Sequence, residues 1–248
     1  MRLQGKTAIV TGGAQGFGAG IVRKFVSEGA RVMIADINGE GAAALAGELG
    51  AATLAQQVDV SSATSVDAMA SAALTAFGSV DILVNNAGVT HLPTPLEDVS
   101  EADFDRVFAV NMKSVYLTAR ALVPHMKARR SGAILNIAST AGVSPRPRLN
   151  WYNASKGWMI TATRTMAVEL APAGVRVNAL NPVAGETPLL KSFMGEDTPE
   201  RRAQFLATIP LGRFSQPEDM GNAACFLCSD EASMITGVAL EVDGGRCI

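Results

Sequence analysis

The sequence predicts an α/β fold in which a doubly wound, seven-stranded parallel sheet is covered by helices on both faces. Two patterns lead to this prediction. Short apolar runs, rich in β-branched residues, alternate with segments of helical periodicity along nearly the whole chain. A glycine-rich turn joins the first predicted strand to the first predicted helix. No linker, repeat or break in composition divides the chain, so we expect residues 1–248 to form a single domain.

The elements follow in order from local signals. Strands are expected at residues 7–10, 31–35, 54–59, 82–85, 133–139, 175–181 and 238–242. Helices are expected after the glycine turn up to Gly29, at 62–77, at 101–130 and at 151–171. The sequence Ser100-Glu-Ala-Asp103 resembles a capping signal for the third of these helices. Pro124 is expected to kink or break that helix, and Pro172 to stop the last one.

Composition excludes several classes of function. The formal net charge is −2 and no basic stripe is visible, which argues against a nucleic-acid partner. No apolar run reaches the roughly 18 residues that span a bilayer, and the chain runs directly into a strand without a signal peptide. The three cysteines suggest reduced thiols and a cytoplasmic protein. Cys225 and Cys228 lie in an apolar helical stretch without further ligands, so we expect core packing and no metal site.

The turn after the first strand is expected to bind a dinucleotide. Glycines there let the backbone approach a pyrophosphate, and the following helix offers aligned N–H groups. The residues expected to contact the cofactor in this turn are Gly12, Gln15, Gly16, Phe17 and Gly18. The glycine spacing is wider than in the usual dinucleotide fingerprint.

The end of the second strand indicates which dinucleotide binds. Asp36 stands where an acid can accept hydrogen bonds from a ribose 2′-hydroxyl, and it would repel a 2′-phosphate. Ile37 and Gln15 supply no cation for a phosphate. These residues predict NAD(H) as the cofactor. A solvated acid at the end of a strand is the alternative reading of Asp36.

Tyr152 and Lys156 are four residues apart in a predicted helix and therefore share one face. A fixed ammonium favours the phenolate, so we expect Lys156 to pull the pKa of Tyr152 toward neutrality. Such a tyrosine could exchange a proton with an alcohol or a carbonyl oxygen. Ser139, thirteen residues upstream of Tyr152, ends a predicted strand and could hydrogen-bond the same oxygen.

The motifs together resemble the short-chain dehydrogenase/reductase family over residues 5 to about 245. The glycine turn resembles that family's Thr-Gly-x-x-x-Gly-x-Gly pattern, and the segment 85–88 its second signature. The residues that resemble its catalytic four are Asn111, Ser139, Tyr152 and Lys156. The resemblance implies a Rossmann-type fold and reversible hydride transfer between NAD(H) and a secondary alcohol or ketone.

The resemblance also implies further roles and contacts. Additional cofactor contacts are expected at Asp59, Val60, Asn86, Ala87, Gly88, Pro182, Val183 and Thr187, and from Tyr152 and Lys156 themselves. Lys156 would bind the nicotinamide ribose, and Asn111 would hold a water that links it to solvent. The segment at about 187–217 would cover a small-molecule substrate, and the helix faces at 101–130 and 151–171 would pack in a homodimer or homotetramer.

Three sets of residues depart from the family pattern or lie beside the expected site. Val183 replaces a usual glycine and Gly185 a usual aliphatic residue, which puts the backbone path over the nicotinamide in doubt. In Arg146-Pro-Arg148, two guanidinium groups could bind an anionic substrate group, with Arg148 named as the substrate residue, or could be solvated loop residues. His91 and Trp151 are further substrate-contact candidates, and structural roles are their alternatives.

Competing functions remain open at this stage. One alternative is a 3-oxoacyl thioester reductase, because the segments 209–214 and 242–245 resemble those enzymes. A sugar or polyol dehydrogenase is another, since fold-level analogy does not choose between substrates. An NAD(H)-binding sensor without catalysis is a reading from a different class. The presence of both Tyr152 and Lys156 counts against it.

Overall fold

The structure, a computed structural model, describes all 248 residues and contains one seven-stranded sheet in which every strand pair is parallel. The strand order is β3-β2-β1-β4-β5-β6-β7, which confirms the predicted doubly wound topology. The strands are β1 (Thr7–Thr11), β2 (Arg31–Asp36), β3 (Thr53–Gln57), β4 (Ile82–Asn85), β5 (Gly132–Ile137), β6 (Val175–Pro182) and β7 (Ala239–Val242). The strand order reverses between β1 and β4, where such sheets bind ligands.

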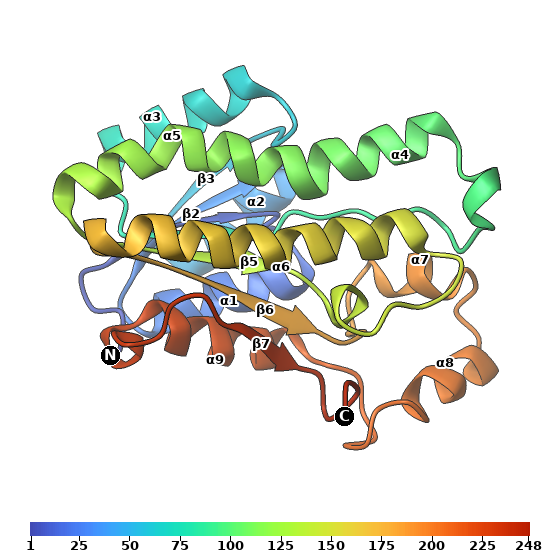
Figure 1. The fold of residues 1–248 in the computed structure, drawn as a ribbon. Helices are drawn as coiled ribbons and strands as arrows, with labels where there is room; N and C mark the ends of the chain where they lie inside the picture. The colour runs from blue at the N-terminus through green and yellow to red at the C-terminus, as the bar shows by residue number, and fades with distance from the viewer.

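Helices cover both faces of the sheet (Figure 1). The α-helices are α1 (Gly16–Ser27), α2 (Gly39–Leu49), α3 (Ala63–Phe77), α4 (Glu101–Val107), α5 (Ser114–Arg129), α6 (Asn150–Leu170), α7 (Leu190–Met194), α8 (Pro199–Leu206) and α9 (Pro217–Cys228). One buried apolar cluster lies under α1, α2 and α9, and a second lies under α3, α5 and α6. The two clusters make the sheet the middle layer of three.

Most predicted element boundaries are confirmed to within about two residues. The side chains of Ser62 and Ser100 accept hydrogen bonds from backbone amides at the starts of α3 and α4, as capping residues do. Cys225 and Cys228 are free, buried thiols within the cluster under α9, as expected from the apolar pattern around them.

The long helix predicted over 101–130 is in fact three segments. Between α4 and α5 lies a π-helical segment, η3 (Phe108–Lys113), whose turns are wider than those of an α-helix. Pro124 does not end the helix, since α5 runs through it to Arg129. The irregularity therefore falls at Asn111, in the middle of the π-helical segment, and not at the proline.

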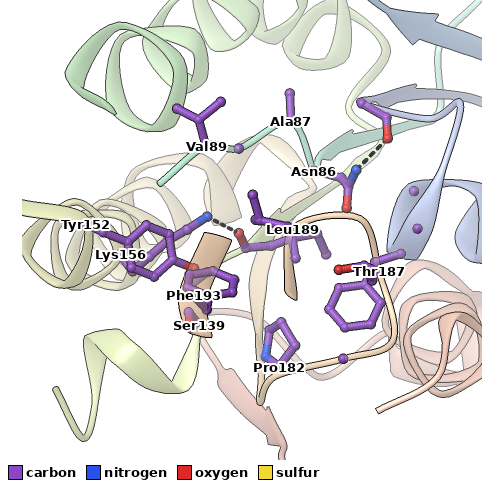
Figure 2. A pocket seen from close by; sticks show the side chains of 18 of the residues that line it. Asn86, Ala87, Val89, Ser139, Tyr152, Lys156, Pro182, Thr187, Leu189 and Phe193 are labelled. Carbon is purple, nitrogen blue, oxygen red and sulfur yellow. Dashed lines mark hydrogen bonds between the residues drawn. The ribbon is translucent and has the colours of Figure 1, made fainter. Parts of the chain in front are cut away.

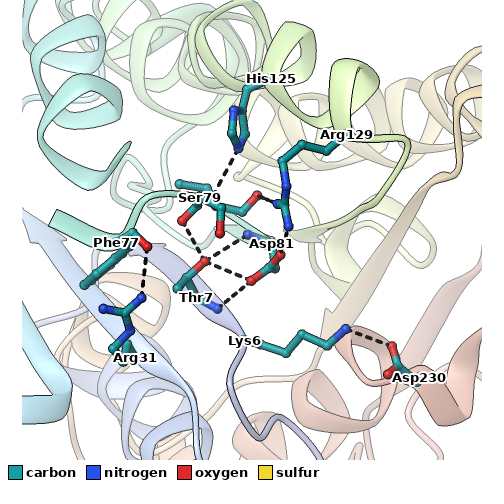
Figure 3. A network of polar contacts seen from close by, with 10 residues as sticks. Lys6, Thr7, Arg31, Phe77, Ser79, Asp81, His125, Arg129 and Asp230 are labelled. Atoms are coloured by element: carbon teal, nitrogen blue, oxygen red, sulfur yellow. Dashed lines mark hydrogen bonds and ion pairs between the residues drawn. The ribbon is translucent and has the colours of Figure 1, made fainter. Parts of the chain in front are cut away.

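A polar network ties together the strand ends opposite the ligand-binding edge (Figure 3). The Asp81 carboxylate accepts from the backbone N–H and the hydroxyl of Thr7, both at 2.9 Å, and from Arg129 at 2.8 Å. His125 accepts a hydrogen bond from the Val80 N–H at 3.3 Å, so its role is structural. These contacts hold β1, β4 and α5 in register at the edge where no ligand is expected.

The segment after β6 forms a small separate layer. It carries α7 and α8, which extend beyond the end of the sheet in Figure 1. Its apolar cluster has only five buried members: Val183, Leu190, Met194, Ile209 and Phe214. No helix of the structure is long and apolar enough to cross a membrane.

Candidate active site

A cavity of about 510 Å³ opens at the C-terminal ends of the strands (Figure 2). The glycine turn, the ends of β2, β4, β5 and β6, helix α6 and the segment after β6 all contribute to its walls. Most residues predicted from the sequence line it: Gly12, Gln15, Gly16, Phe17, Gly18, Asp36, Ile37, Asp59, Val60, Asn86, Ala87, Gly88, Ser139, Tyr152, Lys156, Pro182, Val183 and Thr187.

The glycine turn is held closely against the end of β4. The side-chain amide of Asn86 donates to the carbonyls of Thr11 and Gly12, at 2.9 and 2.8 Å. A Cβ on Gly18 would lie 2.0 Å from the Gly12 carbonyl oxygen, so no larger residue fits there. Gln15 precedes α1 and makes no side-chain cap, which leaves the first amides of the helix available. These features fit a bound pyrophosphate.

The carboxylate of Asp36 is fixed by backbone amides. One oxygen accepts from Ala14 N–H at 2.9 Å and the other from Asn38 N–H at 3.0 Å, and each retains a further lone pair. The only lysine and arginine that line the cavity are Lys156 and Arg146, which belong to its catalytic end. The surroundings of Asp36 therefore suit a ribose diol better than a phosphate.

Asp59 and Val60 complete the lining beside Asp36. The Asp59 carboxylate accepts from the hydroxyl and the N–H of Ser61, at 2.7 and 2.9 Å. These hydrogen bonds lower the pKa of Asp59. Val60 is buried and gives this part of the wall an apolar side chain.

Ser139, Tyr152 and Lys156 lie together at the other end of the cavity (Figure 2). All three are buried, with at most 8 % of each residue exposed. The Lys156 ammonium donates to the Ile137 carbonyl at 2.8 Å and lies 5.8 Å from the centre of the Tyr152 ring. That ring also meets Phe193 of α7, edge to face, at 5.1 Å between centroids. A hydroxyl, a phenol and an ammonium from different parts of the sequence thus lie together in one compact group.

The expected lowering of the Tyr152 pKa is wrong for this structure. Burial raises the pKa of Tyr152 to about 12, and the nearby Ser139 hydroxyl and Arg146 charge offset only part of that rise. Burial also lowers the pKa of Lys156 to about 8. At neutral pH the tyrosine is therefore a neutral phenol and the lysine is still largely protonated.

Asn111 is fully buried and does not line the cavity. Its side-chain oxygen accepts from the Val89 N–H at 2.9 Å, and its amide donates to the Val89 carbonyl and the Ser155 hydroxyl, at 2.9 and 3.0 Å. The side chain therefore joins the segment after β4 to α6, beside Lys156. The water-holding role implied by the family resemblance stays a prediction.

The three substrate residues named from the sequence lie outside the cavity lining. Arg148 is exposed and adopts a positive φ of 67°. His91 is buried, and its Nδ1–H donates to the Leu92 carbonyl, 2.8 Å away. Trp151 packs edge to face on Phe104, with 5.4 Å between ring centroids. Trp151 thus anchors the start of α6, and the prediction of substrate contacts at these residues is not supported.

Residues that sequence reasoning missed line the substrate end. Leu189, Phe193 and Phe205 come from the segment after β6. Of the two loop arginines that the sequence offered as anion ligands, Arg146 lies in the wall and Arg148 does not. The amphipathic run that forms α8 was the one signal that could have indicated Phe205.

The doubt about Val183 and Gly185 is resolved by packing. Val183 does not adopt a positive φ, and it is buried in the small cluster after β6. A Cβ on Gly185 would lie 2.2 Å from Cζ of Phe17, so the phenylalanine ring fills the space of the missing side chain. Valine at 183 and glycine at 185, in place of the family's usual residues, are therefore accommodated without a positive φ in the backbone.

Comparisons with known proteins agree with this geometry. A family model described as enoyl-(acyl carrier protein) reductase matches residues 12–246. The chain is 50 % identical to 4-formylbenzenesulfonate dehydrogenase of Comamonas testosteroni, over all of both chains. It is 40 % identical to D-threitol dehydrogenase of Mycolicibacterium smegmatis, covering 100 % of this chain and 95 % of that one.

A solved structure is also very similar. The crystal structure of 3-ketoacyl-(acyl-carrier-protein) reductase from Brucella melitensis in complex with NADH superposes with a TM-score of 0.95 and 52 % identity. The match covers 99 % of this chain and 100 % of that one. The relatives are thus named as dehydrogenases and reductases. The family model and these relatives show that the chain belongs to the short-chain dehydrogenase/reductase family and is an oxidoreductase.

Proposed function

We propose that this protein transfers a hydride reversibly between NAD(H) and a secondary alcohol or ketone, with Ser139, Tyr152 and Lys156 as its catalytic residues. The observation that carries this proposal is the burial of these three side chains in the same cavity as the glycine turn. A catalytically silent sensor would not need a phenol and an ammonium buried side by side, because each costs free energy to bury.

The roles follow from the protonation states. The nicotinamide supplies or accepts the hydride. Tyr152, a neutral phenol, donates its proton to the carbonyl oxygen in reduction, and Ser139 hydrogen-bonds that oxygen where negative charge develops. Lys156, fixed by the Ile137 carbonyl, places its positive charge beside the phenol and the cofactor ribose.

NAD(H) is proposed over NADP(H). Asp36 lies in the cavity wall with no cation near it that could pair with a 2′-phosphate. The similar Brucella melitensis structure holds NADH, which is in keeping with this choice. The contacts proposed for the cofactor are those of the glycine turn, Asp36, Asp59 and the segments after β4 and β6.

The substrate is proposed to lie under the segment at about 187–217, which supplies Leu189, Phe193 and Phe205 to the cavity wall. The names of the relatives point to different substrates: an aromatic sulfonate, a polyol and a 3-oxoacyl thioester. The apolar and aromatic wall favours a substrate with an apolar body over a polyol. The reductase of acyl thioesters remains the second candidate, supported by its 39 % identical Thermotoga maritima relative.

We also propose a homodimer or homotetramer. Large apolar side chains on α4, α5 and α6 are exposed, among them Phe104, Tyr116 and Val168, with exposures of 42, 58 and 78 %. Such a face is typical of subunit contacts. A cytoplasmic location stays a prediction from the cysteine content.

The experiment that tests the catalytic assignment compares the chain's two tyrosines. Tyr152→Phe should lower kcat by about 10²–10⁴-fold, because the proton donor is lost, while NADH binding measured by fluorescence stays unchanged. Tyr116→Phe, on an exposed helix face, should leave kcat unaltered. Turnover of Tyr152→Phe near the level of the unchanged protein, followed at 340 nm with a panel of ketones, would contradict the assignment.

A further inference from the structure

Arg146 is a half-buried cation without a partner. It lines the cavity that holds Tyr152, yet its guanidinium donates no hydrogen bond and joins no ion pair. The other half-buried arginines all have acceptors: Arg2, Arg176, Arg202 and Arg246 donate to a carboxylate, a carbonyl or a hydroxyl. None of the nitrogens of Arg146 is buried without a partner, so its donors remain accessible to a ligand that enters the cavity.

The position of Arg146 is fixed by its surroundings. Its backbone carbonyl accepts from the side-chain amide of Asn153, in the first turn of α6, at 2.7 Å. Its guanidinium lies over the ring of Phe205 in α8, 4.2 Å from the centroid. The charge therefore stands between the catalytic helix and the segment that covers the cavity, and a stacked guanidinium keeps its donors in one plane.

A second arginine lies nearby and increases the positive charge. Arg246 donates to the Ser144 hydroxyl at 3.3 Å, and its buried Nε has no partner. Burial and the charge of Arg246 together lower the pKa of Arg146. The positive charges of Arg146, in the loop after β5, and of Arg246, in the segment after β7, thus lie near each other. No ion pair of the structure includes either of them.

We propose that Arg146, supported by Arg246, is an anion-binding subsite that selects substrates carrying a carboxylate or sulfonate at a distance from the reacting carbonyl. This inference rests on the function proposed above and names the class of its substrate. The planar guanidinium of Arg146 donates paired hydrogen bonds to two oxygens of the anion. The Leu189 and Phe193 side chains contact the apolar body of the substrate, whose carbonyl then lies at Tyr152. A neutral substrate would leave the charge unpaired and would bind less tightly.

The test measures binding and does not depend on turnover. The complex of the protein with NADH is titrated calorimetrically with benzenesulfonate, with benzoate, and with benzenesulfonamide as the neutral counterpart of the sulfonate. At least one anion should bind about tenfold or more tightly than the sulfonamide, and the preference should weaken as salt is raised. The two anions distinguish a sulfonate subsite from a carboxylate subsite.

Matched variants assign the preference to a residue. Arg146→Gln should abolish the preference for the anion, Arg146→Lys should retain part of it, and Arg246→Gln should reduce it less than Arg146→Gln does. Arg148→Gln, which changes an exposed residue two positions away, should leave it unchanged. A purely structural role for Arg146 would lower the affinity for anion and sulfonamide alike, and the lysine variant would then rescue nothing.

Equal affinities for anions and sulfonamide in the unchanged protein would overturn the inference, and so would a preference that survives Arg146→Gln. These outcomes leave the proposed function intact if ketones are still reduced with NADH. Tyr152→Phe separates the two ideas, because it should lose turnover and keep the anion preference. Retained turnover in that variant would overturn the proposed function and not the subsite.

Discussion

The cavity has two walls that are built in different ways. The wall at the strand ends is fixed by hydrogen bonds between elements distant in sequence, such as Asn86 to the Gly12 carbonyl and Lys156 to the Ile137 carbonyl. The wall formed by residues 187–217 rests on a small apolar cluster and on surface ion pairs. We propose that the first wall meets the cofactor and the reacting atoms and that the second meets the remainder of the substrate.

The difference suggests a division of tasks. Groups that must be placed to within a fraction of an ångström are held by the sheet, where buried hydrogen bonds allow little movement. Groups proposed to choose the substrate lie on the short helices α7 and α8, which rest on a small buried cluster, and on the loop after β5. Relatives named for a sulfonate, a polyol and an acyl thioester share one architecture, which fits selection by the second wall.

The largest expected effect of the remaining tests comes from breaking the first wall. Gly18→Ala places a methyl group 2.0 Å from the Gly12 carbonyl oxygen and 2.6 Å from the Asn86 amide. We expect the free energy of unfolding to fall by roughly 1–3 kcal/mol and NADH binding to weaken, because the turn must shift. Gly47→Ala, in an exposed position of α2 with nothing within 4 Å, is the control. Its free energy of unfolding, measured by chemical denaturation, should rise by about 0.5–1 kcal/mol. Equal effects of the two substitutions would contradict the close fit.

A smaller effect is expected from changing the charge of the first wall. Asp36→Ser should raise kcat/KM for NADPH relative to NADH by about tenfold, because repulsion of a 2′-phosphate is removed. Asp59→Ser removes the same charge from the neighbouring strand end and should change the ratio less. Steady-state kinetics with both cofactors checks this. A preference of the unchanged protein for NADPH would refute the assignment of Asp36.

The smallest effect should come from loosening the second wall. Arg202 of α8 pairs with Glu186 at 2.8 Å and with Asp197, and so ties α8 to the start of the covering segment. Arg202→Gln should raise KM a few-fold while the thermal midpoint hardly changes, since surface ion pairs add little to global stability. Arg201→Gln, at the exposed neighbouring position, should alter neither quantity. A large drop in thermal stability with unchanged KM would show that Arg202 stabilises the fold and does not act on substrate binding.

The first wall could be predicted from the sequence almost residue by residue. Its signals are local: glycine spacing, an acid at the end of a strand, and a tyrosine and lysine one helical turn apart. Each fixes a position within its own element, and the parallel sheet then brings the strand ends together. Local signals of the same kind correctly predicted that Ser62 and Ser100 begin helices α3 and α4.

The packing of side chains from different elements around the cavity could not be predicted in this way. Whether Arg146 or Arg148 enters the cavity depends on the positive φ of Arg148 and on the bond from Asn153 to the Arg146 carbonyl. The side chain that fills the space beside Gly185 comes from Phe17, far away in sequence. The pKa of Tyr152 likewise depends on its burial, which the four-residue spacing to Lys156 does not reveal.

The π-helical segment around Asn111 has a consequence for the length of the chain. A π-turn contains one residue more than an α-turn, so α4 and α5 are out of phase by one position. Deleting one residue between 108 and 113 would therefore allow a continuous α-helix with both flanks still in phase, and the packing of Phe104 on Trp151 would be kept. The wide turn that places Asn111 would be gone, however, and its hydrogen bond to Ser155 would be lost. Local regularity and a correctly assembled site are therefore alternatives here, separated by a single amino acid.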